Sequence, residues 1–194
     1  DTVTDNPLKI VESGWSADQQ GYVHYAFALR NTSTTQQVQY PQITITGRAK
    51  DGSIVFSQTQ ALNMAFPNQT VYDAGQAGEG TAPATVDFVV LSPDTYNVTE
   101  AQGTATFPIS GTSIDNRDGG TTFNGEVRAV ADGFKPSDGQ QIKISLVLRN
   151  AQNAIIYGDI AFVDWPGNGR STPFSITVYD LPKYVSYDLY AQIW

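Results

Sequence analysis

Residues 142–148 read Ile-Lys-Ile-Ser-Leu-Val-Leu, with an aliphatic side chain at every second position. Successive side chains of a β-strand point to opposite faces, so this pattern predicts a strand with one buried face. Residues 23–29, Val-His-Tyr-Ala-Phe-Ala-Leu, follow the same rule, and so do residues 43–46 and 86–90. No stretch of useful length has the spacing of an amphipathic helix. The sequence therefore predicts an all-β protein.

Turn sequences separate the expected strands. Asp-Gly pairs begin at Asp51, Asp132 and Asp138, and residues 166–169 read Pro-Gly-Asn-Gly. Gly and Asn tolerate the positive φ of tight hairpin turns. Short strands between turns spaced roughly 8–12 residues apart are typical of a sandwich or barrel. Residues 63–83 show no strand pattern, and we expect them to form a long irregular loop that is mobile or contacts a partner.

The strand pattern occurs twice along the chain. Residues 43–51 match residues 142–150, and the apolar residues 54–56 match residues 155–157 after a longer turn. Order and chemical character are both preserved. Two copies of such long units indicate the duplication of a domain and not a solenoid.

We therefore expect two tandem antiparallel β-sandwich domains, at residues 1–102 and 103–194. No Pro- or Ser-rich spacer marks the join near Gly103, and so short a connection gives little reach. The two domains are thus expected to sit end to end in a nearly fixed orientation. The first core is expected to contain Leu8, Ile10, Val23, Tyr25, Phe27, Leu29, Ile43, Ile45, Ile54, Phe56, Phe88 and Val90. The second is expected to contain Ile109, Phe123, Val127, Ile142, Ile144, Leu146, Leu148, Ile155, Ile176 and Leu189.

The first repeat also carries a family resemblance. Residues 29–33 read Leu-Arg-Asn-Thr-Ser, an alternating strand then leads into Lys-Asp-Gly-Ser-Ile-Val at 50–55, and a Tyr96-containing strand follows Pro93. This order resembles the FxLYD domains and related Ig-like or fibronectin-like modules of exported bacterial proteins. The resemblance implies tandem Ig-like sandwiches, an extracytoplasmic location and a binding or spacer role. It supplies no catalytic residues.

Composition argues against several classes of function. The net charge of −8 disfavours nucleic acid and anionic membranes as partners. The absence of cysteine excludes thiol catalysis, Cys-ligated zinc and disulfides. No apolar run approaches the ~20 residues of a membrane-spanning helix. The chain begins Asp1-Thr2 without Met, so we expect that a targeting segment has been removed.

No catalytic constellation is visible in the sequence. His24 is the only histidine, and no nucleophile motif accompanies it, so we interpret it as a surface or edge residue. The glutamates are scattered and most aspartates lie in turns, which disfavours a glycosidase-like carboxylate pair. Acidic loops around Asp115 and Asp118, and around Asp132 and Asp138, are candidate calcium sites, but ordinary turn chemistry is the favoured interpretation. We expect no enzyme and no cofactor.

Aromatic residues near loops are the remaining candidates for ligand contact. Trp165 directly precedes the turn at 166–169, and Tyr40, Tyr72 and Tyr179 also lie near expected loops. An exposed aromatic ring can stack on a sugar or anchor a protein partner, although Trp165 also suits core or inter-domain packing.

Three functions remain open at this point. The first is a non-catalytic extracytoplasmic interaction or spacer module, such as the soluble part of a bacterial surface lipoprotein, with a protein or glycan partner at the cell surface. The second is a carbohydrate-binding module, which requires exposed coplanar aromatics. The third is a hydrolase, which requires converging carboxylates.

Overall fold

The computed structural model describes residues 1–194 and confirms the all-β prediction. It contains antiparallel strands, one short 3₁₀ turn (η1, Thr95–Asn97) and no α-helix, so no helix in it could cross a bilayer. The strands are β1 Leu8–Ala17, β2 Val23–Asn31, β3 Gln36–Gln39, β4 Gln42–Arg48, β5 Ile54–Ala61, β6 Met64–Ala65, β7 Thr70–Ala77, β8 Thr85–Val90, β9 Val98–Glu100, β10 Thr104–Thr106, β11 Ile109–Arg117, β12 Gly120–Arg128, β13 Val130–Asp132, β14 Gln141–Arg149, β15 Ile155–Asp164, β16 Ser171–Tyr179 and β17 Ser186–Ile193.

The N-terminal half, β1 to β9, packs two three-stranded sheets around one core. Their strand orders are β1-β2-β7 and β5-β4-β8, and a short third sheet, β6-β3-β9, lies at one end. Period-two alternation places Tyr25 and Phe27 of β2 against Ile43 and Ile45 of β4, all fully buried. Phe88 of β8 completes the aromatic part of this core through tilted contacts with both β2 rings.

The C-terminal half, β10 to β17, has the same arrangement of main strands. Its sheets have the orders β11-β12-β16 and β15-β14-β17, with β10 and β13 pairing at one end. In these orders β14 is central in its sheet, as β4 is in its own. The core of this half is centred on Phe123 of β12 and on Ile142, Ile144 and Leu146 of β14.

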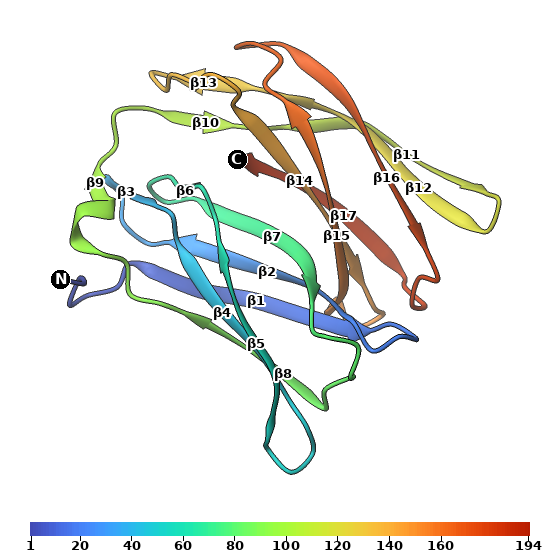
Figure 1. The fold of residues 1–194 in the computed structure, drawn as a ribbon. Helices are drawn as coiled ribbons and strands as arrows, with labels where there is room; N and C mark the ends of the chain where they lie inside the picture. The colour runs from blue at the N-terminus through green and yellow to red at the C-terminus, as the bar shows by residue number, and fades with distance from the viewer.

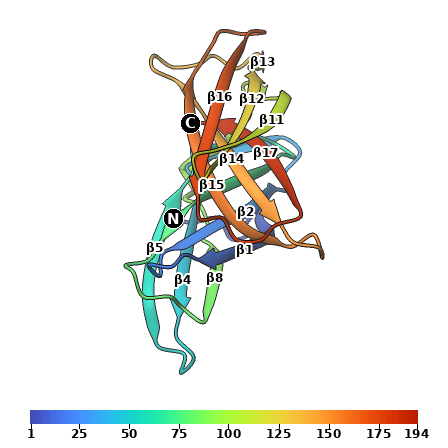
Figure 2. The same ribbon diagram turned by 90° about the vertical axis from the view of Figure 1, so that its right-hand side faces the viewer.

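The two halves lie face to face, so the expected end-to-end arrangement is wrong. The outer face of β1-β2-β7 packs on the outer face of β15-β14-β17, which gives four stacked layers (Figures 1 and 2). Small side chains allow this close approach, because Ala26 and Ala74 contact Val147 and Ile155 at the centre. The middle sheets are thus buried on both faces, and β14 exposes almost nothing.

Three more sequence-based expectations are corrected by this packing. Ile54 is 61% exposed at the start of β5 and lies outside the core. Ile155 is buried between the halves and not within the second core. The segment expected to be an irregular loop, residues 63–83, contains β7. This strand lacked a clear pattern because Asp73, Ala74 and adjacent residues are buried on both of its faces.

Polar side chains surround the small apolar centre of the junction. Arg149 of β14 bonds Glu12 of β1, and its Nε also donates to Asp188 at 2.8 Å. Tyr72 stacks on Tyr190 with ring centroids 3.7 Å apart and donates its hydroxyl to Glu12. The two halves are therefore held in one relative orientation by directional contacts as well as by packing.

The Glu12–Arg149 pair predicts a specific dependence of stability on pH. The hydrogen bond from Arg149 holds the pKa of Glu12 below its usual 4.5, against the opposing effect of burial. A lowered folded-state pKa means that this contribution is complete above the unfolded-state value and is lost as pH falls through the folded one. We expect Glu12→Gln to destabilise the protein at neutral pH and to flatten its acid-side stability loss.

Urea unfolding between pH 7 and about pH 3 measures this effect. Subtracting the variant from the wild type isolates the contribution of Glu12 from those of other acidic groups with lowered pKa values, such as Asp18 and Asp51. Glu126→Gln, on an exposed face of β12, is the matched control. Identical pH profiles for Glu12→Gln and wild type would contradict the prediction.

Candidate functional site

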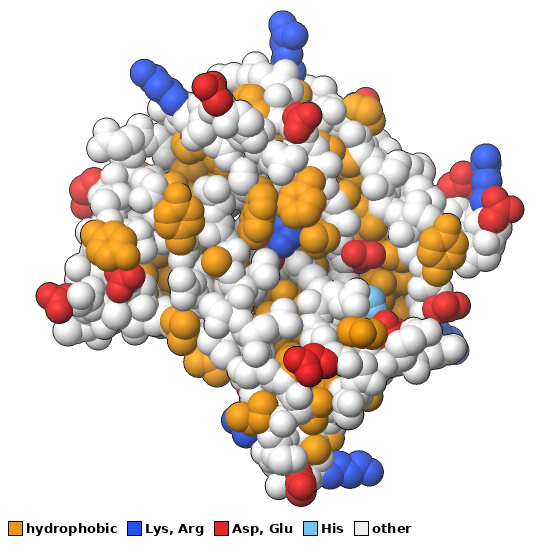
Figure 3. Space-filling view, viewed as in Figure 1, with side chains coloured by type: hydrophobic (Ala, Val, Ile, Leu, Met, Phe, Trp, Pro, Cys, Tyr) orange, Lys and Arg blue, Asp and Glu red, His pale blue; other side chains and the backbone are white.

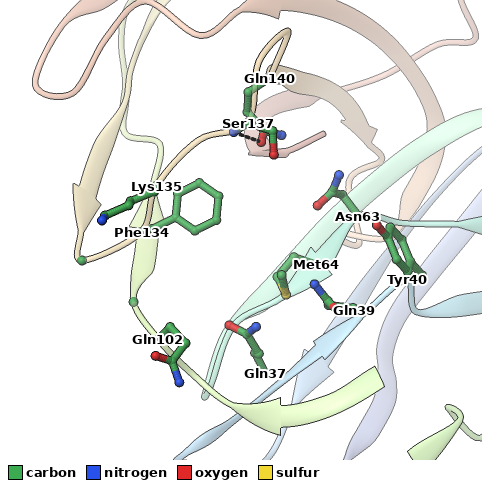
Figure 4. A pocket seen from close by; sticks show the side chains of 12 residues that line it. Gln37, Gln39, Tyr40, Asn63, Met64, Gln102, Phe134, Lys135, Ser137 and Gln140 are labelled. Carbon is green, nitrogen blue, oxygen red and sulfur yellow. Dashed lines mark hydrogen bonds between the residues drawn. The ribbon is translucent and has the colours of Figure 1, made fainter. Parts of the chain in front are cut away.

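The largest cleft of the molecule lies between the ends of the two halves. It has a volume of about 640 Å³ and is formed by the β3–β6 region on one side and the segments around β13 and the start of β14 on the other (Figure 4). The lining residues are Gln37, Gln39, Tyr40, Asn63, Met64, Gln102, Gly103, Gly133, Phe134, Lys135, Ser137 and Gln140.

Strand alternation positions the first wall. Val38 is fully buried in the N-terminal core, so its neighbours Gln37 and Gln39 face the cleft. Tyr40 follows with a φ of 51°, in the left-handed region, and its backbone N–H donates to the carbonyl of Asn63 at 2.9 Å. This turn holds the tyrosine ring 56% exposed at the rim of the cleft.

The opposite wall is held by aromatic packing and by a close backbone approach. Phe134 packs edge-on against Phe66 and at 6.1 Å from Trp165, measured between ring centroids. Gly103 has no room for a side chain, because a Cβ there would overlap the backbone of Gly133 and Phe134. This contact brings the join between the halves directly against the cleft, with Phe134 and Lys135 lying across it from Tyr40 (Figure 4).

Carboxamide groups dominate the chemistry of the cleft. One of them is already used, because Gln140 donates to the carbonyl of Trp194 and accepts from the backbone N–H of Ser137. A carboxamide both donates and accepts hydrogen bonds without carrying charge. The cleft is lined by no Asp, Glu or His, and its only cation is Lys135. The arrangement suits recognition of an uncharged polar ligand and offers no carboxylate or imidazole for proton transfer.

The sequence-predicted aromatic residues fall at three different places. Tyr40 lines the cleft, and Trp165 lies behind its wall, edge-on to Phe107 at 5.9 Å between centroids. Tyr72 is engaged in the junction between the halves. Tyr179 is exposed at the end of β16, beside a smaller hollow of about 270 Å³. The structure therefore brings only Tyr40 and, as support, Trp165 to the main cleft.

Sequence reasoning missed the carboxamides. The run Gln36-Gln-Val-Gln-Tyr40 has polar residues on both sides of one buried valine, a short strand pattern with an amide-bearing face. That pattern was available as a signal. The contributions of Gln102 and Gln140 depend on how the halves pack, and no local pattern carries that information.

His24 lines the smaller hollow, where its side chain is 16% exposed. Its Nε2 lies 2.8 Å from Asp18 Oδ2, and its ring stacks on Tyr157 at 4.8 Å. Burial raises the pKa of nearby Asp159. The structure brings together no group of three or more His, Asp or Glu side chains that could ligate a metal ion, and Asp115 pairs instead with Arg117.

Comparison with known proteins does not assign the chain to a group. No family model matches it, and no curated protein was found to be related to it.

Proposed function

We propose that this chain is a non-catalytic binding module that acts outside the cytoplasm and holds a neutral glycan in the cleft between its halves. The carrying observation is a cleft of about 640 Å³ lined by five carboxamide side chains and the exposed ring of Tyr40, with no carboxylate or imidazole. The five carboxamides are Gln37, Gln39, Asn63, Gln102 and Gln140.

The chemistry of a neutral glycan complements this lining. Sugar hydroxyls donate and accept hydrogen bonds, as carboxamides do, and the apolar face of a sugar ring stacks on an aromatic side chain. Proteins usually orient a small ligand with a small number of polar groups that converge on a preformed concave site. Charged side chains are sparse and scattered over the face shown in Figure 3, which favours an uncharged ligand.

The architecture also bears on the alternatives. A spacer gains reach from end-to-end domains, whereas the face-to-face packing here shortens the molecule. A hydrolase with two carboxylates needs them to face each other across the cleft, and this lining contains none. A protein partner at the cell surface is the second candidate, because Tyr40 and the neighbouring exposed Leu91 would suit an apolar contact.

The proposal extends to the origin and location of the module. The matching strand orders of the two halves support two Ig-like sandwiches, residues 1–102 and 103–194, that arose by duplication. An extracytoplasmic location is supported by the resemblance of both repeats, most clearly residues 21–100, to modules of exported proteins. The chain would then be the soluble part of a secreted protein or a bacterial surface lipoprotein.

Tyr40→Ala is expected to weaken glycan binding about tenfold, which corresponds to 1.4 kcal/mol. Gln39→Ala should weaken it as well, because a partner hydroxyl then stays unpaired. Binding is measured by titration calorimetry with the best ligand from a panel of neutral oligosaccharides. Tyr179→Ala, which removes an exposed tyrosine outside the cleft, should leave affinity unchanged.

Two results would overturn the proposal. One is a wild-type protein that binds no neutral oligosaccharide of the panel. The other is a Tyr40→Ala variant with the affinity of the wild type. Binding of a protein ligand that is lost in Tyr40→Ala would establish the second candidate instead.

A further inference from the structure

An amine and a carboxyl group meet in the buried junction between the halves. Lys143 Nζ of β14 lies 2.7 Å from Asp73 Oδ1 of β7, and the two side chains are 2% and 0% exposed. Lysine and aspartate are almost never fully buried unless they are paired. This pair is the most deeply buried contact between opposite charges in the molecule, and it joins the N-terminal half to the C-terminal half.

The surroundings of the pair keep water away. The ring of Trp194 lies 4.2 Å from Lys143 Nζ, measured to its centroid, and Phe162 covers the amine at 5.9 Å. Asp73 stands opposite Phe27 in the register of β2 and β7, at the edge of the N-terminal core. Two charges in such a site lose far more hydration energy than surface charges do.

The carboxyl group is only half satisfied by its hydrogen bonds. Asp73 Oδ1 accepts from Lys143 and from Gln192 Nε2, which lies 2.8 Å away, whereas Oδ2 has no partner. A stable buried carboxylate needs both oxygens paired. Burial accordingly raises the pKa of Asp73 despite the adjacent lysine. The environment therefore disfavours the ionised carboxylate of Asp73 and favours its carboxylic acid form.

We propose that Lys143 and Asp73 condense to form an intramolecular isopeptide bond that links the two halves covalently. The lone pair of Nζ attacks Cγ of Asp73, and the C–N bond forms as the bond from Cγ to Oδ2 breaks. The reaction converts –NH₂ and –COOH to –NH–CO– and releases one water molecule. No oxidant, reductant or other reactant is needed.

The observed contacts suit each part of this step. Gln192 Nε2 donates to Oδ1, where negative charge develops when the amine attacks, and so acts as an oxyanion donor. Oδ2 is the oxygen left free to carry the acid proton; it takes a second proton from Nζ and departs as water. The halves hold the amine against the carboxyl group, which removes the entropic cost of bringing two reactants together.

The intact mass of the wild-type chain tests the proposal. We expect the purified, denatured protein to be lighter than its sequence by one water molecule. Trypsin should then leave Lys143 uncut, so that residues 129–149 remain attached to residues 51–117, the fragment that carries Asp73. Tandem mass spectrometry of the branched peptide places the bond.

Lys143→Arg is the matched control. Arginine keeps the positive charge beside Asp73 but does not form an amide under these conditions, so this variant should have its full sequence mass. The control is needed because Asp-Gly pairs such as Asp51-Gly52 can also lose water by cyclising. A wild type with its full mass would overturn the proposal, and so would an equal loss of water in Lys143→Arg. Neither result depends on glycan binding.

Discussion

A Gly158→Val variant is expected to unfold at a much lower temperature than the wild type. Gly158 lies on β15 where the two halves meet, and a Cβ at this position would overlap the backbone carbonyl of Tyr25 and come within 2.8 Å of Ala74 Cβ. Neither neighbour can move away easily, because both belong to the buried sheet β1-β2-β7. Inserting volume into a packed interior costs about 1–3 kcal/mol, and more where backbone must shift.

Calorimetric unfolding and small-angle scattering measure the two consequences. We expect a loss of about 3 kcal/mol or more, together with a larger radius of gyration if the halves separate. Thr44→Val is the control, because it is a close match in shape and lies on the outer sheet β5-β4-β8, away from the junction. A Gly158→Val variant with wild-type stability and shape would mean that the halves do not pack in this way.

Lys143→Met is expected to cost about 3–5 kcal/mol of the free energy of unfolding, because it leaves the buried carboxyl group of Asp73 without its partner. Adding Asp73→Leu should restore the part of this loss that comes from the unpaired carboxyl group. Buried ion pairs can be replaced by apolar side chains of similar size at little cost. Any deficit that remains in the double variant reports the constraint of the covalent link.

Urea unfolding of the wild type, both single variants and the double variant forms a double-mutant cycle. We expect a large coupling energy between the two positions. Independent, additive effects of Lys143→Met and Asp73→Leu would show that the two side chains do not interact in the folded protein.

Strands with one buried face could be predicted from the sequence, because their alternation records a single environment. Residues 43–46 of β4 are such a case, whereas residues 23–29 and 142–148 were correctly predicted as strands but lie in central strands that are buried on both faces. The prediction failed at β7, whose residues serve the N-terminal core on one face and the junction on the other. The prediction that Ile54 lies in the core failed for the opposite reason. The strand β5 begins beyond the covered part of the core, so an aliphatic residue there is exposed to solvent.

The face-to-face packing of the two halves is partly visible in the sequence of the strands that form the contact. Ala26 and Ala28 occupy the positions between the core residues of β2, so that this strand is apolar on both faces. A strand that reads as apolar on both faces is typical of a sheet covered on both sides. The cleft could be predicted only in part. Tyr40 was a candidate from the sequence, whereas the carboxamides on the C-terminal side reach the cleft only because of how the halves join.

The contact between the halves uses two different surfaces, and this bears on self-assembly. The outer face of β1-β2-β7 meets the outer face of β15-β14-β17, so their counterparts, the outer faces of β11-β12-β16 and of β5-β4-β8, stay free. A contact between unlike surfaces does not close on itself and can propagate from one copy to the next as a fibre.

The side chains on the two free faces oppose such polymerisation. Rows of hydroxyl and amide groups bond one another across the strands, as Thr122 does with Thr177 at 2.8 Å and Ser175 with Asn124 at 2.7 Å. On the other free face, Arg48 pairs with Asp87. The two sheets that meet at the junction carry alanine and glycine at the centre of their contact. Pressing these faces together would strip water from groups that have no new partners. We therefore expect the molecule not to polymerise, although the contact between its halves is of a kind that could repeat from copy to copy as a fibre.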